Sequence, residues 1–364
     1  MKLYDQNKDC CGCGACAAVC GGAITMRQDR EGFCYPCVDE KRCVRCGRCR
    51  EVCPLKHVEL LPGVHKYYGA RNKDEPVRYQ SSSGGIFSVL AEYVLEKSGS
   101  VFGAGYTDDM EVRHMEIKKR EDLDRVRRTK YVQSQVDSFV YRSIRDRLKM
   151  GKWVLFTGTP CQTEALRIFL DEEYDRLILT DLVCYGAGSP GIWKKYIRYL
   201  NRRNKADVKE YYFRDKRNRD NGHTVSWKTS GGETSYSIYE DPYCRMYFRN
   251  VIIRPSCYEC PYCRPERSSD FTIGDFWGIE KIRPDLDDGM GNSLVILHSP
   301  KGEKIWNELK GKYSALECRR EDALQPRLKE PTACPENRGR FMRYYQYLPF
   351  ILLAKRYRGK KFFS

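Results

Sequence analysis

Nineteen cysteines occur in this chain of 364 residues, and eight of them form two runs of identical spacing. Each run reads C-x2-C-x2-C-x3-C: Cys10, Cys13, Cys16 and Cys20, then Cys43, Cys46, Cys49 and Cys53. Three cysteines spaced two residues apart let one tight loop reach three corners of an iron–sulfur cube. The fourth cysteine, about a turn further on, points to a second cube. The duplicated run therefore predicts two [4Fe-4S] clusters.

This spacing is typical of bacterial ferredoxins, in which each run gives its last cysteine to the other cluster. We accordingly assign the ligand sets as Cys10, Cys13, Cys16 and Cys53 for one cluster, and Cys43, Cys46, Cys49 and Cys20 for the other. A pair of zinc sites is the alternative, but zinc favours C-x2-C pairs separated by a longer spacer. Cys11, Cys34 and Cys37 are surplus, and we interpret Cys34 and Cys37, in a predicted hairpin, as packing residues.

A further set of cysteines follows predicted strands in the remainder of the chain. The residues predict a strand at 153–156, a helix at about 162–170 and a strand at 177–183, which together make a βαβ unit. Cys161 and Cys184 come just after the two strands, whose carboxyl ends meet at one edge of a parallel sheet. Cys257, Cys260 and Cys263 are spaced C-x2-C-x2-C and need a further ligand from elsewhere. A zinc knuckle or a half-ferredoxin run is the alternative reading of these three.

Two glycine-containing stretches suggest binding of a phosphate group. The segment 79–85, Tyr-Gln-Ser-Ser-Ser-Gly-Gly, precedes apolar residues at helical spacing, so its amides lie at a helix N-terminus, where phosphates bind well. A plain capped turn is the alternative there. Gly186, Gly188 and Gly191 spell G-x-G-x-x-G, but Pro190 stiffens that turn and no clear acidic strand end follows. We therefore do not assign a nicotinamide site to it.

Several short motifs occur together in one order along the chain. They are Ser-Ser-Gly-Gly (82–85), Lys-Tyr-Val-Gln-Ser (130–134), Gly-Thr-Pro-Cys-Gln (158–162), Val-Cys-Tyr-Gly (183–186), Phe-Arg-Asp-Lys (213–216), Ser-Cys-Tyr-Glu-Cys (256–260) and Asp-Phe-Thr-Ile-Gly-Asp-Phe-Trp-Gly (270–278). Across roughly residues 1–310 the chain resembles the family of coenzyme F420 hydrogenase/dehydrogenase β subunits, with a ferredoxin domain in front. The resemblance implies an α/β fold (α+β overall), in which a small two-cluster ferredoxin-like domain precedes an FAD-binding domain with a mainly parallel sheet.

The resemblance also implies residue roles and domain limits. It places a third [4Fe-4S] cluster on Cys161, Cys184, Cys257 and Cys260, with Cys263 as the fallback for Cys161 or Cys184. It places FAD on Ser83, Gly84, Gly85, Lys130, Tyr131, Gln133, Ser134, Gly158 and Gln162. The expected domains are the ferredoxin domain (1–61), a linker (62–78), the FAD and cluster domain (79–310) and a basic C-terminal extension (311–364).

These expectations describe an oxidoreductase that receives single electrons from ferredoxin or another redox protein. The electrons pass through the clusters to FAD, and FAD then transfers hydride to an organic acceptor. The resemblance leaves the acceptor open between a deazaflavin and an unknown molecule, with surface-polysaccharide synthesis as an association in bacterial relatives. An electron-transfer subunit without its own substrate is the alternative, and a zinc-containing nucleic-acid-binding protein is a weaker one. No catalytic proton donor and no oligomeric state can be assigned from the sequence.

The formal net charge of +16 is the main reason to consider nucleic acid as a binding partner. Three clusters and one FAD would together remove about 8 of these charges, so nucleic acid is not the predicted partner. Nineteen cysteines without a secretory leader indicate a reducing, cytoplasmic setting. The basic tail from Arg338 onward is the one segment for which we consider contact with a membrane surface. We expect this tail to pack on its own domain instead.

Overall fold

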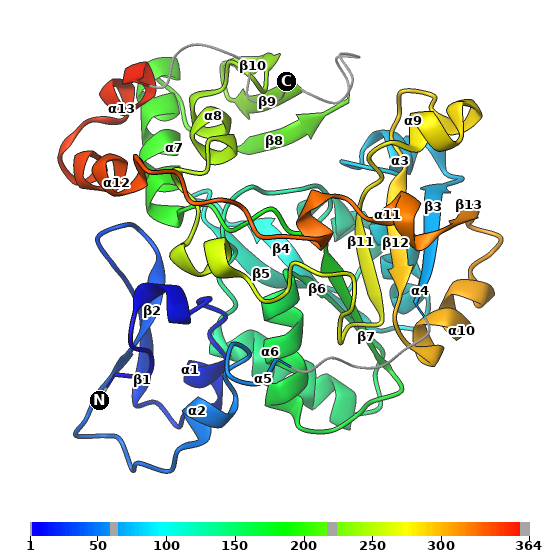
Figure 1. Cartoon of the computed structure of the whole chain (residues 1–364), viewed down its shortest axis with the longest axis horizontal. Helices are drawn as coiled ribbons and strands as arrows, with labels where there is room; N and C mark the ends of the chain where they lie inside the picture. The colour runs from blue at the N-terminus through cyan, green and yellow to red at the C-terminus, as the bar shows by residue number, and fades with distance from the viewer. Residues whose placement is uncertain (1, 59–64, 217–223, 357–364) are drawn as a thin grey trace.

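The computed structural model describes residues 2–58, 65–216 and 224–356 of the chain. Its centre is an eight-stranded sheet in the order β13-β3-β12-β11-β7-β6-β4-β5 (Figure 1). The strands are β3 (Lys66–Asn72), β4 (Ser100–Tyr106), β5 (Val112–Ile117), β6 (Val154–Gly158), β7 (Leu177–Leu182), β11 (Phe271–Asp275), β12 (Ser293–Leu297) and β13 (Tyr313–Cys318). Strands β3, β4, β6, β7 and β11 run in one direction, which confirms the α/β class with a mainly parallel sheet.

The predicted βαβ unit lies in the middle of this sheet. It consists of β6, α6 (Pro160–Leu170) and β7, and the two strands are parallel neighbours with Phe156 opposite Leu179. Thr159 caps α6, and its side chain and that of Gln162 form a reciprocal capping box. This cap begins α6 immediately after β6, so Cys161 lies in the first turn of the helix at the carboxyl edge of the sheet.

Helices cover both faces of the sheet because alternate strand residues point in opposite directions. Leu155 and Ile178 pack with α4 (Ile86–Glu96) and α10 (Pro300–Glu308) on one face. Phe156 and Leu179 pack with α5 (Ser138–Lys149) and α6 on the other face. Near-continuous apolar strands of this kind are typical of a sheet buried on both sides. The resulting layers pack β6 and β7 between helices on both faces of the sheet.

The N-terminal cysteine runs form a small unit at one side of the sheet (Figure 1). It contains η1 (Asn7–Asp9), α1 (Ala15–Val19), the antiparallel pair β1 (Ile24–Gln28) and β2 (Cys34–Val38), and α2 (Arg48–Glu51). Its side chains Ala15, Ala18 and Val52 are buried in one hydrophobic cluster with residues of α5 and α6. The unit therefore shares a core with the α/β part of the chain.

The prediction of a linker at 62–78 is wrong for its described part. Residues 66–72 form β3, which is hydrogen-bonded to β12 on one side and β13 on the other, and α3 (Glu75–Tyr79) follows. The segment looked like a linker because it has few aliphatic residues, but a strand inside a sheet is held by backbone hydrogen bonds on both edges. Gly69 is needed there because a Cβ would approach the ring of Phe276 to 2.8 Å. Residues 62–64 of the predicted linker lie outside the described residues.

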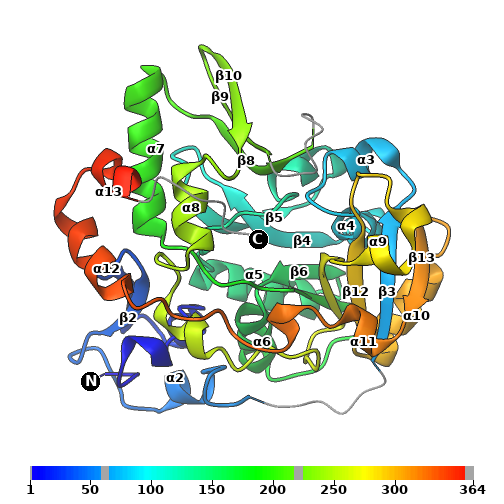
Figure 2. The same cartoon turned by 45° about the horizontal axis from the view of Figure 1, so that its top comes forward.

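An aromatic-rich cluster forms the other side of the molecule. It joins α7 (Pro190–Asn204), α8 (Pro242–Phe248) and the antiparallel sheet β8 (Glu210–Asp215), β9 (Thr224–Thr229) and β10 (Gly232–Ser237). Figure 2 shows α12 (Arg338–Tyr347) and α13 (Phe350–Arg356) beside α7. Phe350 and Leu353 are buried in this cluster, so the described part of the basic tail packs on its own chain, as predicted.

The C-terminal extension predicted at 311–364 needs a correction, because β13 belongs to the central sheet through its pairing with β3. Residues 357–364 of that extension lie outside the described residues. Short helices complete the chain: η2 (Arg120–Arg125), η3 (Pro255–Glu259), α9 (Ile279–Ile282), η4 (Pro284–Leu286), α11 (Arg320–Ala323) and η5 (Pro326–Leu328). Within the described ranges, no helix combines the length and the apolar character that crossing a bilayer requires.

Candidate iron–sulfur and flavin site

The structure brings together Cys10, Cys13, Cys16 and Cys53, the four cysteines that the sequence assigns to one cluster. Burial, followed by the charges of Cys10 and Cys53, raises the pKa of the Cys16 thiol to about 12. The pKa of Cys53 is likewise raised, first by burial and also by Cys10. The last cysteine of the second run has thus joined the first three of the first run. We call these four residues the first group; that they ligate a cluster stays a prediction.

The remaining four cysteines of the two runs form a second group, made of Cys20, Cys43, Cys46 and Cys49. Burial raises the pKa of Cys49, and the charges of Cys20, Cys46 and Cys43 raise it further. Cys46 is exposed, so this group lies at the surface of the molecule. The charge of Cys49 also acts on Cys16, which places the second group beside the first.

Glycines allow the first run to wind tightly against the body of the protein. Gly14 has φ of +85° and caps α1, and a Cβ there would come within 2.5 Å of the Val136 carbonyl oxygen. The Tyr141 hydroxyl of α5 donates a hydrogen bond of 2.9 Å to the carbonyl oxygen of Cys13. Only glycine tolerates this combination of a left-handed backbone and a close approach.

The third group contains the cysteines that follow β6 and β7 together with two from η3 and the residue after it. Burial raises the pKa of Cys184, and then the charges of Cys257, Cys161 and Cys260 raise it further. Four thiols from three distant segments thus surround one space; that they ligate a cluster stays a prediction. Cys263 interacts with Cys260 through their thiols, and this contact lowers the pKa of Cys260 to about 7. Cys263 therefore remains an available alternative ligand.

Cys11 is a site residue that sequence reasoning missed. Its thiol interacts with both Cys13 of the first group and Cys161 of the third group, and it is buried. The sequence signal was only that Cys11 is adjacent to Cys10 and left over from the spacing. In the structure it is the side chain that connects the two groups.

One cavity of about 330 Å³ lies against the third group. Six cysteines line it: Cys11, Cys161, Cys184, Cys257, Cys260 and Cys263. The predicted FAD residues that line it are Ser83, Gly85, Lys130, Tyr131, Gln133, Ser134, Gly158 and Gln162. We call it the cysteine-lined cavity. Gly84 does not line it; its N–H instead donates to Ser293 Oγ at 3.0 Å, and a Cβ would meet the Ala70 carbonyl oxygen at 2.4 Å.

The wall predicted to face the flavin is built mainly from residues 130–134. The Lys130 ammonium donates to the carbonyl oxygens of Arg127 at 2.9 Å and Arg128 at 3.2 Å, and burial lowers its pKa to about 7. The ring of Tyr131 stacks on that of Tyr247 with centroids 4.9 Å apart. A planar aromatic wall next to a cation suits an anionic ring system.

Gln162 and Ser134 have structural partners that limit their part in binding. The Gln162 side-chain amide donates to the Ser134 carbonyl oxygen at 2.9 Å, and its oxygen accepts from the Thr159 N–H at 3.0 Å. Ser134 Oγ is 2.8 Å from His114 Nδ1, and burial lowers the pKa of His114 to about 4. These contacts hold the wall of the cavity in place. His114 also lines the cavity and was not foreseen from the sequence.

Two further features of the cavity were missed because they depend on distant segments. The Thr157 hydroxyl is buried at the cavity and has no hydrogen-bond partner among the described residues. Arg214 and Asp275 form an ion pair in the wall of the cavity. Burial is the largest influence on the pKa of Arg214 and lowers it, but the charge of Asp275 opposes burial and the net pKa is raised. An orphaned buried hydroxyl calls for a ligand or a water molecule, so the cavity fits a polar group at this point.

The donor types fit iron–sulfur clusters, since each of the three groups offers four thiols. No three His, Cys, Asp or Glu side chains among the described residues converge closely enough for a single metal ion. The fit to clusters therefore rests on the number, type and grouping of the thiols.

Comparisons with known proteins find sequence similarity over part of the chain. Residues 151–320 match the model of a family described as the C terminus of the beta subunit of coenzyme F420 hydrogenase/dehydrogenase. A subunit of the F(420)H(2) dehydrogenase of Methanosarcina mazei is 27% identical, over 48% of this chain and 52% of the relative. The coenzyme F420-dependent sulfite reductase of Methanocaldococcus jannaschii is 28% identical, over 43% of this chain and 24% of the relative. The chain thus spans about half of one relative and a quarter of the other.

A solved structure of the F420-reducing [NiFe] hydrogenase complex from Methanosarcina barkeri contains a chain with 17% identity and a TM-score of 0.46, covering 82% of this chain and 89% of that one. The matched region 151–320 contains β6, α6 and β7 and all four cysteines of the third group. The sequence match relates residues 151–320 of this chain to the C-terminal part of coenzyme F420 hydrogenase/dehydrogenase beta subunits.

Proposed function

We propose that the chain is an iron–sulfur flavoprotein oxidoreductase that accepts single electrons from ferredoxin or a similar redox protein and delivers hydride to an organic acceptor. The observation that carries this proposal is the cysteine-lined cavity, where the third group and the predicted FAD residues share one space. When bound, the three [4Fe-4S] clusters would supply one-electron transfer and FAD would supply the conversion to two-electron chemistry.

The three groups form a continuous series from the surface to the cavity. The second group is exposed at Cys46, and it lies beside the first group through Cys49 and Cys16. Cys11 then connects the first group to Cys161 of the third group, which lines the cavity. A series of redox sites from surface to interior is the arrangement that an electron relay needs. This order supports entry of electrons at the second group.

The chain's own residues would bind and orient the flavin. The N-terminal turn of α4 offers N–H groups to a pyrophosphate, because the first amides of a helix have no intrahelical partner. In the loop before it, the N–H groups of Ser81 and Gly84 already donate to the Arg78 carbonyl oxygen and to Ser293 Oγ. Lys130 supplies a cation next to Tyr131 on the wall predicted to face the flavin ring. A protonated Lys130 would favour an anionic reduced flavin over the oxidised one.

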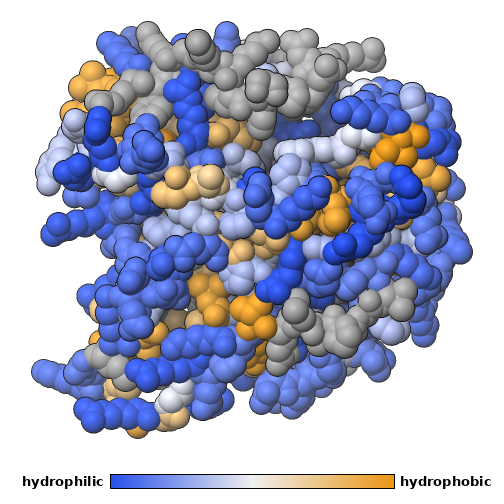
Figure 3. All heavy atoms as spheres, in the orientation of Figure 1, coloured by the Kyte–Doolittle hydropathy of each residue, from blue (hydrophilic) through white to orange (hydrophobic). Residues whose placement is uncertain are grey.

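A basic surface surrounds the second group and suits an acidic partner. Lys41, Arg42, Arg45, Arg48 and Arg50 are all exposed. Within the described part of the chain, none of these five side chains forms an ion pair. The unit is largely hydrophilic on the face shown in Figure 3. Unpaired cations around an exposed redox site steer an acidic carrier to it.

Anaerobic purification followed by iron, sulfide and flavin assays tests the proposal. About twelve irons and one FAD per chain are the expected result. The variant Cys184→Ser is expected to lose about four of these irons, while Cys37→Ser, at an exposed hairpin position, keeps them all. About eight irons without flavin would contradict the flavin chemistry, and zinc without sulfide would contradict the whole proposal.

A second candidate is an electron-transfer subunit of a larger complex without its own acceptor. It is favoured by the Methanosarcina mazei relative, which is one subunit of a dehydrogenase. Under this alternative the purified chain would oxidise reduced ferredoxin only after a second protein is added. Under the main proposal it would reduce a deazaflavin or another organic acceptor alone. The association with polysaccharide synthesis stays a prediction.

A further inference from the structure

Arg254 is a completely buried cation without a carboxylate partner. Its side chain is 0% exposed, and it precedes η3, the element that carries Cys257. The guanidinium donates to the carbonyl oxygens of Cys10 at 2.8 Å and Cys34 at 3.1 Å, and to Gln133 Oε1 at 2.9 Å. All of these acceptors are neutral. Among the described residues, no aspartate or glutamate forms an ion pair with Arg254.

The other buried arginines show how unusual this is. Four further arginines are buried, and each forms an ion pair with a carboxylate: Arg78 with Asp288, Arg127 with Asp124, Arg267 with Asp181 and Arg338 with Glu31. A charge taken out of water is destabilising unless an opposite charge and hydrogen bonds compensate it. The most deeply buried arginine of the five is therefore the one that lacks its counter-charge in the polypeptide.

The surroundings of Arg254 offer sulfur as the counter-charge. Its Nη2 lies 3.7 Å from the sulfur of Cys10 in the first group, and Cys257 of the third group is three residues further along the chain. The guanidinium also lies over the Tyr35 ring, 4.2 Å from its centroid. Gly12 leaves room for the guanidinium, because a Cβ at this position would come within 2.7 Å of Arg254 Nη1.

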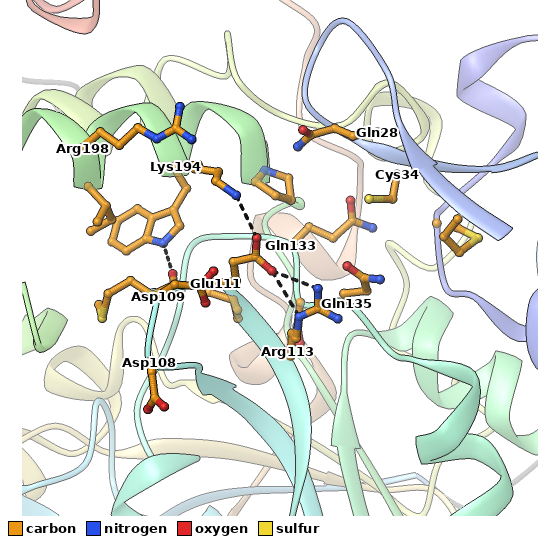
Figure 4. Close-up of a pocket in the computed structure, with 18 of the residues that line it drawn as sticks. Gln28, Cys34, Asp108, Asp109, Glu111, Arg113, Gln133, Gln135, Lys194 and Arg198 are labelled. Carbon is orange, nitrogen blue, oxygen red and sulfur yellow. Dashed lines mark hydrogen bonds and ion pairs between the residues drawn. The ribbon is translucent and has the colours of Figure 1, made fainter.

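Arg254 also ties together three segments that are distant in sequence: the first cysteine run, the β1–β2 hairpin and the segment before α5. Gln133 and Cys34, whose oxygens it binds, both line a separate cavity of about 590 Å³ between the hairpin, β5 and α7 (Figure 4). The Gln133 side chain in turn donates to the Cys11 carbonyl oxygen at 2.8 Å. The cation is thus fixed by neutral hydrogen bonds at the junction of the first and third groups.

We propose that Arg254 is a positioning residue that supplies the positive charge for the cysteine-held clusters of the first and third groups and raises their reduction potentials. This inference rests on the proposed function. Reduction adds negative charge to a site that is already anionic, so a fixed cation in a poorly solvated place stabilises the reduced form more than the oxidised form.

The test is a potentiometric titration of the anaerobically loaded protein, followed by electron paramagnetic resonance. Arg254→Gln is expected to lower the midpoint potentials of the first and third groups, by 59 mV or more in at least the first group, whose Cys10 sulfur the guanidinium approaches. A shift of 59 mV is a tenfold loss in the reduction equilibrium of a one-electron couple. Arg254→Lys keeps the charge and should restore most of the potential. Arg78→Gln removes another buried arginine, one whose hydrogen bonds go to Asp288 and Gly291 and to no cysteine, and the potentials should stay unchanged.

A second variant covers the case in which Arg254→Gln does not fold. Gln133→Glu places a carboxylate against the guanidinium and leaves Arg254 in place, so it should also lower the potential. Unchanged potentials in whichever of these two variants loads with iron would overturn the inference. If the unaltered protein itself contains no iron and sulfide, the proposed function fails; if it titrates normally and the variants do not shift, only the role of Arg254 fails.

Discussion

The thiol of Cys11 interacts with the thiol of Cys161, although the two residues belong to the N-terminal unit and to the first turn of α6. Because the Cys11 thiol also interacts with that of Cys13, it lies between the first and third groups. Packing of α1 against α5 and α6 brings these two parts of the chain together.

We predict that Cys11→Ala separates electron transfer from cluster loading. Because Cys11 is not needed to complete either group, the variant should keep about twelve irons. Transfer from the first to the third group should slow severalfold, because a cavity replaces the buried sulfur. Stopped-flow reduction of the flavin by ferredoxin measures this rate.

The matched comparison for Cys11 is Cys161→Ser. That variant should lose about four irons and, with them, electron transfer to the flavin. Equal iron loss in the two variants would show that Cys11 is itself a ligand.

The basic surface around the second group should control the reaction with the electron donor. Arg45→Glu together with Arg48→Glu should slow reduction by an acidic ferredoxin about tenfold or more at low ionic strength, and salt should shrink the difference. Arg202→Glu with Arg203→Glu, at the exposed end of α7, makes the same charge change elsewhere. That control should react at nearly the unaltered rate. Reduction by dithionite, a small molecule, should be equal in all three proteins.

The loop before α4 should be intolerant of a methyl group. In Gly84→Ala the new Cβ would overlap the Ala70 carbonyl oxygen of β3, which we expect to destabilise the protein by about 1–3 kcal/mol. Because the loop forms one end of the cysteine-lined cavity, flavin content should fall while the first and second groups keep about eight irons. Gly231→Ala, in an open hairpin, is the control and should retain flavin. Full flavin content in Gly84→Ala would contradict a role of this loop in binding.

Lys130 should make the stability of the flavin-free protein depend on pH. The folded protein releases the Lys130 proton near pH 7, because burial lowers its pKa, whereas the unfolded chain holds it until about pH 10. Between these values the unfolded chain binds more protons, so the free energy of unfolding contributed by this group rises with pH. Lys130→Met should reduce the rise of the unfolding free energy with pH by up to about 1.4 kcal/mol per pH unit, as measured by urea titrations between pH 7 and 10.

Part of this slope should survive in Lys130→Met, because burial also lowers the pKa of Lys216 to about 7. Lys304→Met, an exposed position on α10, should leave the slope as it is. An identical pH dependence in Lys130→Met and the unaltered protein would show that Lys130 is not buried as described.

The cysteine spacing predicts the first and second groups, because three of the four thiols in each group come from one short C-x2-C-x2-C stretch. That these groups ligate clusters stays a prediction. The βαβ unit was predictable for a similar reason, since apolar runs and the cap of α6 are local signals. The third group came from family resemblance, and the structure brings its four thiols together around one space.

Other features depended on the tertiary structure alone. β3 has few aliphatic residues, and only pairing with β12 and β13 makes it a strand. Cys11 and Arg254 have no spacing that marks them, because their partners come from segments far away in the sequence. The sequence by itself determined which thiols are grouped within the N-terminal unit. The packing of that unit against α5 and α6 decided how the groups connect, because burial and charge at a junction depend on every segment that meets there.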